Sequence, residues 1–419
     1  MNPGDDALRF GLLVLAGSGA ALLAVQSHRL TSRLRVPAPA LFLLAAVLVV
    51  TLVPGVQPPP ERTVERVVTV ALLVILFDGG LHLGRRRLRG SLAPVLSLGL
   101  LGTFATVAGV AVLAHLLLGI DAYAAVLLAT AVSPTDPAVV FSVLGQQEVE
   151  GRSGTILEGE SGANDPVGIA LLTALMAAGS LSVGAVSQAL GAFALQLAVG
   201  AAVGLVGGRL VLLLWRRLPL PGEGLYAVRV LVGAGTVFGL ATVAHGSGFL
   251  AVFVAGIVLA DEPAPYKVEV ERFHAALASL AEIVAFFVLG LTIDVHVLAC
   301  ADVWGPGLVL GVLLTLVIRP LLAGPFLLPF LLPARGELAF VLLAGLKGAV
   351  PLLLGTLLRP LPGGERLYGV VVVVTVLSVA VQGAAVPTVA RRLGLRLTRR
   401  EPPGELVDPT LPPPPPEQG

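Results

Sequence analysis

Long apolar stretches separated by short polar ones run through almost the whole chain. Runs of about 18 or more apolar residues recur from one end to the other, and an uninterrupted run of that length is typical of a membrane-spanning helix. The pattern therefore predicts an all-α polytopic membrane protein with about 13 transmembrane helices. We expect these helices at residues 8–28, 38–56, 64–84, 92–119, 121–145, 155–178, 185–215, 226–243, 247–261, 276–299, 304–332, 335–358 and 367–391.

Composition strengthens this interpretation. The 419 residues are 56% hydrophobic and 13% charged, whereas soluble domains carry about 25% charged residues. Cys300 is the only cysteine, so neither disulfides nor a thiolate metal site are expected to organise the fold. The first apolar run lacks the basic segment and cleavage site of a signal peptide, so we expect it to remain as a span.

Basic residues are distributed unevenly between the predicted loops. Loops that follow odd-numbered helices hold 18 Lys and Arg residues and the opposite side holds 5. By the positive-inside rule, the amino terminus is expected outside and the carboxyl terminus in the cytoplasm of a cell-membrane protein. Residues 1–395 form the predicted transmembrane domain. Residues 396–419, with prolines from Pro412 to Pro416, are predicted to be a short disordered cytoplasmic tail.

Three predicted helices each carry an ionisable side chain to a similar depth. Counted from the end where its helix enters the membrane, Lys347 lies about 18 Å in, Asp165 about 15 Å and Asp136 about 22 Å, within a hydrocarbon core about 30 Å thick. Arg319 also falls inside a predicted span. Charged groups at such depths are costly unless paired or hydrated, so each is a candidate functional residue.

The helices that carry Asp136 and Lys347 are also predicted to be broken. Pro134 and Pro137 remove two backbone donors around Asp136, and glycines and a proline punctuate residues 345–351 around Lys347. Unwound backbone inside a membrane is tolerated only in a buried or watery site, where its carbonyls can bind a cation. Paired breaks in the two halves of a transporter indicate an inverted repeat with its binding site at the breaks.

One face of the helix at 155–178 gathers oxygen ligands. Positions 160, 161, 164 and 165 fall on the same side of a helix, and they hold Glu160, Ser161, Asn164 and Asp165. Such hard oxygen ligands suit an alkali cation. A carboxyl group in a low-dielectric medium also holds its proton to a higher pH than it does in water. A single group that binds either a proton or a cation gives obligatory exchange of the two.

The order and spacing of several motifs resemble the monovalent cation:proton antiporter-1 family of sodium/proton and potassium/proton exchangers. The main match is the sequence Thr135-Asp136-Pro137, followed by Glu160-Ser161-x-x-Asn164-Asp165. Further matching stretches lie at residues 76–81, 247–256, 286–291, 319–320 and 345–351. Each motif is weak or moderate alone, but together they cover nearly the whole span region.

The resemblance implies a role for each residue of this group. Asp165 would bind the cation and carry the proton, and Thr135 and Ser161 would add oxygen ligands. Asp136 would lie beside the site, and Asn164 would hold the two broken helices together. Because an asparagine precedes the aspartate, the resemblance also implies electroneutral, one-for-one exchange. Capping of an unwound helix end is an equal alternative to cation binding for Asp136 and Thr135.

One residue departs from the family pattern. The family usually has an arginine at the position of Lys347, and that arginine pairs with the acidic residue that corresponds to Glu160. A lysine supplies the charge without the two-pronged guanidinium. We therefore predict a structural Glu160–Lys347 pair, with Arg319 as a scaffold residue that neutralises a core carboxylate. Glu282, towards a helix end, is expected to be interfacial.

The resemblance further implies a homodimer in which a core bundle, including about 92–178 and 276–358, moves like an elevator. Expected partners are the lipid bilayer and a second copy, with no nucleic acid, nucleotide or cofactor; Na⁺, K⁺ or Li⁺ and H⁺ are the transported ions. The alternatives are a cation channel and an intramembrane hydrolase. The sequence shows no selectivity filter, no His-Glu-x-x-His motif and no nucleotide-binding loop. It does not separate Na⁺ from K⁺.

Overall fold

The computed structural model describes residues 37–53, 56–144, 147–149, 152–331 and 334–399, together with a few isolated positions before residue 37. Over these ranges the regular elements are helices apart from one short antiparallel strand pair, which confirms the predicted all-α class. Apart from those isolated positions, the first predicted helix, 8–28, lies outside the described residues, as does the tail from residue 400 onward.

The described elements, in chain order, include three π-helical segments, which are labelled η. They are α3 (Ala38–Leu52), α4 (Glu61–Leu83), α5 (Arg85–Arg89), α6 (Leu92–Leu96), η1 (Ser97–Gly102), α7 (Thr103–Leu118), α8 (Ala122–Val132), α9 (Pro137–Leu144), β1 (Gln147–Val149), α10 (Ser153–Ala178), α11 (Val183–Arg217), α12 (Glu223–Val243), α13 (Gly248–Ala260), α14 (Lys267–Gly290), α15 (Val295–Leu298), α16 (Ala301–Leu313), η2 (Leu314–Ala323), α17 (Gly324–Leu331), α18 (Arg335–Leu343), α19 (Ala349–Leu358), α20 (Gly364–Val376), η3 (Leu377–Gln382), α21 (Gly383–Arg392) and β2 (Leu397–Arg399).

Every predicted span after the first overlaps a described helix, a run of joined helices or, at 121–145 and 335–358, a broken pair. The predicted bounds 276–299 are wrong, because α14 runs from Lys267 to Gly290 and only the short α15 follows it. Among the described residues, 7 helices are long and apolar enough to cross a membrane on length and composition, and shorter apolar helices accompany them. The predicted span 304–332 is interrupted by η2, which contains Pro320. A π-helical turn absorbs the backbone bond that a proline removes. By contrast, α11 is continuous for 35 residues, about 52 Å, which is longer than a hydrocarbon core about 30 Å thick.

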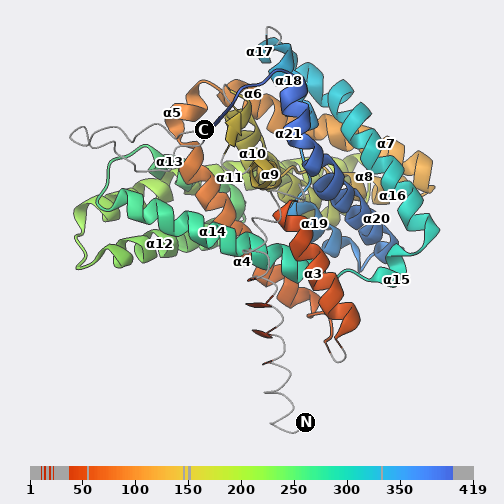
Figure 1. Cartoon of the computed structure of the whole chain (residues 1–419), viewed down its shortest axis with the longest axis horizontal. Coiled ribbons are helices and arrows are strands. Elements are labelled where there is room, and N and C mark those ends of the chain that lie inside the picture. Colours follow the sequence, from red (N-terminus) through yellow and green to blue (C-terminus); the bar gives the residue numbers. More distant parts are fainter. Residues whose placement is uncertain are drawn as a thin grey trace, which may run out of the picture.

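The helices fall into two groups that lie side by side (Figure 1). One group contains α3, α4 and α11 to α14, with α4 packed along both α13 and α14. The α4–α13 contact is close because both helices present glycines: a side chain at Gly80 would come within 2.4 Å of the Phe253 carbonyl oxygen, and one at Gly256 within 2.4 Å of the Phe77 carbonyl oxygen. Small residues of this kind let membrane helices approach each other closely.

The second group contains α6 to α10 and α16 to α21, including both broken pairs, α8/α9 and α18/α19. Helix α10, which carries the predicted oxygen-rich face, packs against α8, η1 and α6 of this group and also against α11. The predicted core range 276–358 includes most of α14, and the contacts of α14 lie mainly with α4 and α3 of the first group.

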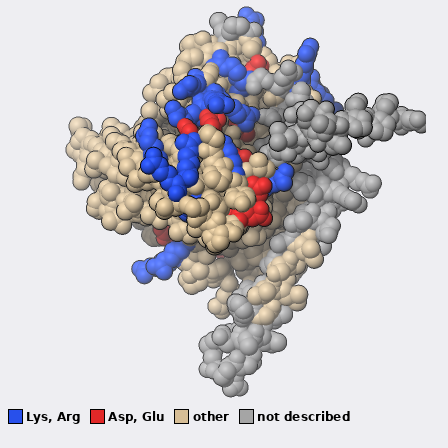
Figure 2. All heavy atoms as spheres, turned by 90° about the vertical axis from the view of Figure 1, so that its left-hand side faces the viewer, with Lys and Arg blue, Asp and Glu red and all other residues tan. Residues whose placement is uncertain are grey.

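One end of the molecule is basic. Figure 2 shows Lys and Arg side chains gathered at its upper end, where α5 lies in Figure 1, and Arg85, Arg86, Arg87 and Arg89 of α5 are all exposed. These residues belong to one of the loops that the positive-inside count placed in the cytoplasm. The first residues of the predicted tail are ordered as β2, which pairs with β1.

Candidate ion-binding site

The two broken helices meet at their breaks. The first break separates α8 from α9 at residues 133–136, and the second separates α18 from α19 at residues 344–348. The amide of Asp136 donates a hydrogen bond to the carbonyl oxygen of Leu346 at 2.8 Å, so the unwound segments touch backbone to backbone. This contact confirms the predicted pair of broken, crossing helices.

Gly348 makes this close crossing possible. A side chain at this position would place its first carbon 1.9 Å from Asp136 Oδ2 and 2.3 Å from Asp136 Cβ. No side chain fits at that distance, so the second break can approach the first only with a glycine there. The glycines predicted to weaken this helix therefore have a second role in packing.

Lys347 binds the end of α8. Its Nζ donates to the carbonyl oxygens of Ser133 at 2.8 Å and Pro134 at 3.2 Å. These are carbonyls released by the first break, at the partially negative carboxyl end of a helix, where a cationic side chain is favourable. The predicted free carbonyls around Asp136 are thus occupied by an ammonium group of the protein itself, and Lys347 is only 3% exposed.

Arg319 occupies the corresponding place at the end of α18. Its Nε donates to the Leu342 carbonyl at 2.9 Å and its Nη2 to the Val341 carbonyl at 3.3 Å. The same Nη2 forms an ion pair with Glu160 Oε2 at 2.7 Å. The guanidinium lies against the backbone of Gly345, where a side-chain carbon would fall 2.2 Å from its Cζ.

The predicted Glu160–Lys347 pair is therefore wrong, and the predicted neutralising role of Arg319 is supported by its geometry. Glu160 is 1% exposed and Arg319 4% exposed, so the pair is sealed from solvent. A planar guanidinium can bind a carboxylate and two carbonyls at once, whereas an ammonium on a flexible stem acts as a point charge. Lys347 instead points toward the carbonyls of the first break.

Asp136 caps the two remaining helix ends. Its Oδ1 accepts a hydrogen bond from the Ala138 amide at 2.8 Å, and its carboxylate also accepts one from the Ala349 amide. These amides lie in the first turns of α9 and α19, where negative charge is favourable. The geometry thus supports the capping interpretation of Asp136, which is partly exposed.

Asn164 ties α10 to the first break. Its Oδ1 accepts from the Thr135 amide at 3.2 Å, and its Nδ2 donates to Thr135 Oγ1 at 2.8 Å and to Glu160 Oε1 at 3.4 Å. The expected link to both broken helices is therefore direct only for the first. The second is reached through the Glu160–Arg319 pair.

Asp165 is the carboxylate of the crossing that keeps an oxygen free. Its Oδ2 accepts a hydrogen bond from Ser161 Oγ at 3.4 Å. Its Oδ1 is buried and has no hydrogen-bond partner among the described residues, and the residue is 7% exposed. The charges of Asp136, Lys347 and Glu160 all act on it. A buried carboxylate oxygen without a partner is costly, and either a proton or a cation would relieve that cost.

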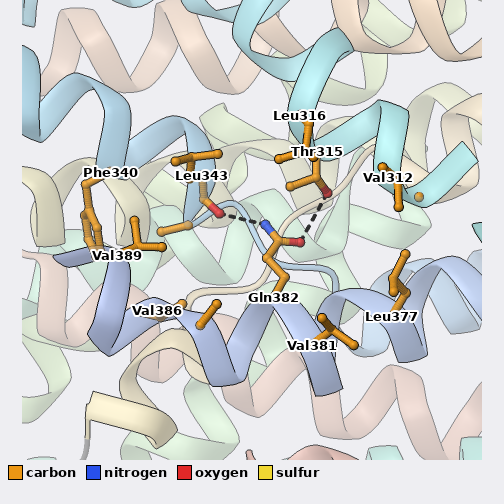
Figure 3. A pocket seen from close by; sticks show the side chains of 13 residues that line it. Val312, Thr315, Leu316, Phe340, Leu343, Leu377, Val381, Gln382, Val386 and Val389 are labelled. Atoms are coloured by element: carbon orange, nitrogen blue, oxygen red, sulfur yellow. Dashed lines mark hydrogen bonds between the residues drawn. The ribbon is translucent and has the colours of Figure 1, made fainter. Parts of the chain in front are cut away.

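Gln382 and Ser378 hold the second break, and neither was predicted from the sequence. Gln382 of η3 donates from Nε2 to the Leu343 carbonyl at 2.7 Å and accepts from Thr315 Oγ1 at 3.3 Å (Figure 3). Its Oε1 also accepts from Ser378 Oγ at 2.8 Å, and that hydroxyl accepts from the Lys347 amide at 2.9 Å. A lone glutamine within an apolar span was the available signal, because polar side chains there usually bind across helices.

A helical membrane bundle with two crossed, broken helices and a buried, partly unsatisfied carboxylate defines a secondary transporter of small ions. The chain belongs to the family described as sodium/hydrogen exchanger, transmembrane, whose sequence profile matches residues 19–392. This is a family of transporters, so the protein is not an enzyme and the intramembrane hydrolase interpretation is rejected.

Individual relatives agree with this placement. The chain is 33% identical to the K(+)/H(+) antiporter NhaP of Alkalimonas amylolytica over 81% of its own length and 59% of that protein. It is 32% identical to the K(+)/H(+) antiporter NhaP2 of a Shewanella species over 92% of its length and 68% of that protein. Similarity to the Na(+)/H(+) antiporter NhaH of Halobacillus aidingensis is 27% over 85% of this chain and 91% of that one.

A solved structure shares the fold. The sodium proton antiporter MjNhaP1 from Methanocaldococcus jannaschii superposes with a TM-score of 0.73 at 20% identity, covering 90% of this chain and 99% of that one. This likeness confirms the predicted antiporter architecture.

Proposed function

We propose that this protein is a secondary active antiporter that exchanges a monovalent cation, Na⁺ or K⁺, for H⁺. The observation that carries the proposal is the buried, unpartnered Oδ1 of Asp165. Around it, the charges of Glu160, Arg319 and Lys347 all have partners. Asp165 is thus the group of the crossing that gains most from binding an ion. The K(+)/H(+) and Na(+)/H(+) names of the relatives support exchange rather than channel conduction.

The balance of charges supports electroneutral exchange. The crossing holds three acidic groups, Glu160, Asp136 and Asp165, and two basic ones, Arg319 and Lys347. With all five ionised, one negative charge remains. Either one proton or one monovalent cation neutralises it, so the loaded site carries the same charge in both forms. One-for-one exchange then moves no net charge across the membrane.

The cation would be held by oxygen atoms already gathered at the crossing. Asp165 would provide the carboxylate, and Ser161 and Thr135 would provide hydroxyl oxygens. Asp136 would lie beside the cation while it caps α9 and α19. Glu160, whose oxygens both accept bonds, would act on the ion by its charge alone.

We further propose a homodimer in the cell membrane, with the amino terminus outside and the basic end of Figure 2 facing the cytoplasm. The family resemblance supports the dimer, and the positive-inside distribution supports the orientation. The range of transported cations includes Na⁺, K⁺ and Li⁺, since the ligand set does not distinguish among them.

Purified protein in lipid vesicles tests the exchange. A preformed pH gradient should collapse when Na⁺, K⁺ or Li⁺ is added, equally with and without a clamped membrane potential. Asp165→Asn should abolish the effect, and Asp302→Asn, which changes an exposed aspartate, should leave it intact. Retained exchange in Asp165→Asn would overturn the role of Asp165. A rate that follows the applied potential would overturn electroneutrality.

A further inference from the structure

A cavity of about 290 Å³ lies in the second helix group, beside the second break. Its walls come from α16 with η2, from α18, and from η3 with α21. The 13 described residues that line it include none of the carboxylates of the crossing, and two of them, Thr315 and Gln382, have polar side chains (Figure 3). Those two are hydrogen-bonded to each other. A cavity with so apolar a wall excludes water and suits an apolar ligand.

The mouth of the cavity faces the apolar surroundings of the bundle. Two of its walls belong to helical runs that are long and apolar enough to cross a membrane, Ala301–Leu331 and Gly364–Arg392. Near the middle of these runs, the lining residues Leu316 and Val381 are 60% and 62% exposed. Apolar side chains exposed at the middle of a span meet lipid tails, which are as apolar as leucine. The hydrocarbon of the bilayer therefore borders the cavity.

The length of the cavity matches one leaflet of a bilayer. Figure 3 shows Val389 and Phe340 at one end of the cavity and Leu377 at the other. Leu377 and Val389 are 12 positions apart in the chain, about 18 Å at the rise of an α-helix. Half of a hydrocarbon core is about 15 Å thick. A cavity of this length accommodates one acyl chain of one leaflet from end to end.

Basic side chains lie beyond one end of the cavity. Helix α21 ends at Arg392, which is exposed and, three positions after Val389, shares a helical face with it. The exposed Arg335 begins α18. The first turn of α18 lies against the end of α21, since a side chain at Gly336 would come within 2.7 Å of the Leu393 carbonyl oxygen. Guanidinium groups at such a place suit the phosphate of a lipid headgroup.

We propose that this cavity is a lipid-binding site that takes one acyl chain of an anionic phospholipid, with the lipid phosphate at Arg392 and Arg335. The apolar wall selects the chain, and the two guanidinium groups select the charge of the headgroup. The bound chain would pack against Gln382, whose amide holds the Leu343 carbonyl at the end of α18. The proposal requires that the chain spans a membrane and is independent of the ion that it exchanges.

Photochemical attachment of a lipid tests the proposal. The purified protein is placed in phosphatidylcholine vesicles that contain a little phosphatidylglycerol with a photoreactive group near the end of one acyl chain. Mass spectrometry should locate the attached lipid on lining residues such as Leu377 and Val312. Unlabelled phosphatidylglycerol should compete at least about fivefold better than phosphatidylcholine. Attachment spread evenly over the exposed apolar faces of the helices would overturn the proposal.

Two changes separate the chain from the headgroup. Ala385→Trp, at an exposed lining position, should fill the cavity and lower attachment at least about fivefold, whereas Ala108→Trp, at an exposed position of α7, should not. Arg335→Gln combined with Arg392→Gln should remove the preference for phosphatidylglycerol, and Arg217→Gln should keep it. Unchanged attachment in Ala385→Trp, or an unchanged preference in the double variant, would refute the site. The wild-type attachment map needs no variant, so the test holds even if Ala385→Trp folds poorly.

A second copy of the chain is the other body that could cover the mouth of the cavity. Val381→Cys in a Cys300→Ser background distinguishes the two, because Cys300 is the only native cysteine. We expect no disulfide-linked dimer through position 381 under oxidising conditions. Formation of that dimer in place of lipid attachment would overturn the proposal.

Discussion

Removal of the Arg319 guanidinium should destabilise the protein more than any other single loss of a basic group at the crossing. Arg319→Met leaves Glu160, 1% exposed, as an uncompensated buried charge, which costs about 3 to 5 kcal/mol. It also removes the donors of the Leu342 and Val341 carbonyls, at up to about 1 to 3 kcal/mol each without full additivity. We therefore expect a loss of about 4 to 6 kcal/mol in the free energy of unfolding.

A double-mutant cycle isolates the ion pair. Glu160→Gln combined with Arg319→Met should cost about 2 kcal/mol less than the sum of the two single changes, because no unpaired buried charge remains. Arg319→Lys should recover part of the loss, since an ammonium replaces the charge and leaves at least one carbonyl uncapped. The same cycle between Glu160 and Lys347 should give a smaller coupling, because no hydrogen bond joins them.

The assay is titration with a denaturing detergent, with the folded fraction followed by helical circular dichroism and tryptophan fluorescence. Arg217→Met, an exposed position in the last turn of α11, is the control and should cost under about 1 kcal/mol. An Arg319→Met variant no less stable than this control would refute the assignment. So would a larger coupling of Glu160 to Lys347 than to Arg319.

Three further changes test other contacts of the crossing. Gly348→Ala should abolish exchange and lower the free energy of unfolding by about 3 kcal/mol or more, since the added carbon lies 1.9 Å from Asp136 Oδ2. Gly239→Ala adds a carbon that meets nothing within 4 Å, so it should change neither the exchange rate nor the free energy of unfolding. Lys347→Met should slow exchange at least about tenfold, because the Ser133 and Pro134 carbonyls lose their donor. Lys347→Arg should restore most of the rate, and equal rates for the two variants would contradict the assignment. Gln382→Ala should lower the free energy of unfolding by about 1 to 3 kcal/mol through the Leu343 carbonyl, and an unchanged value would show that another donor replaces it.

The helix breaks and the shared face of α10 could be predicted because their signals are local. Pro134, Pro137 and the glycines at 345 and 348 act on the backbone where they stand. The positions of Glu160 and Asp165 on one helical face follow from the period of the helix. Both features depend only on a few neighbouring residues, so one sequence is sufficient to find them.

The choice of partners could not be predicted in the same way. Counting residues along a span gives the depth of a side chain and leaves the rotation of its helix unknown. The π-helical turn at η2 changes that rotation around Arg319. The sequence therefore did not show that Glu160 pairs with Arg319 and not with Lys347. The side-by-side packing of α14 with α4 was hidden for another reason. Apolar helices in lipid carry only a weak amphipathic signal to show which face meets which neighbour.

The crossing places four helix ends at one point, and the signs of the side chains match the ends that they meet. Lys347 and Arg319 bind the carbonyl ends of α8 and α18, while Asp136 binds the amide ends of α9 and α19. This division fits a lysine at position 347, where the family resemblance implied an arginine. Its ligands are two carbonyls, which a point charge can satisfy, because Arg319 already provides the forked contact that a carboxylate needs. The charges of Lys347, Arg319, Glu160 and Asp136 all have partners at helix ends or in the Glu160–Arg319 pair. The carboxylate of the crossing that keeps an oxygen without a hydrogen-bond partner among the described residues is that of Asp165, and for this reason we propose it as the group that exchanges ions.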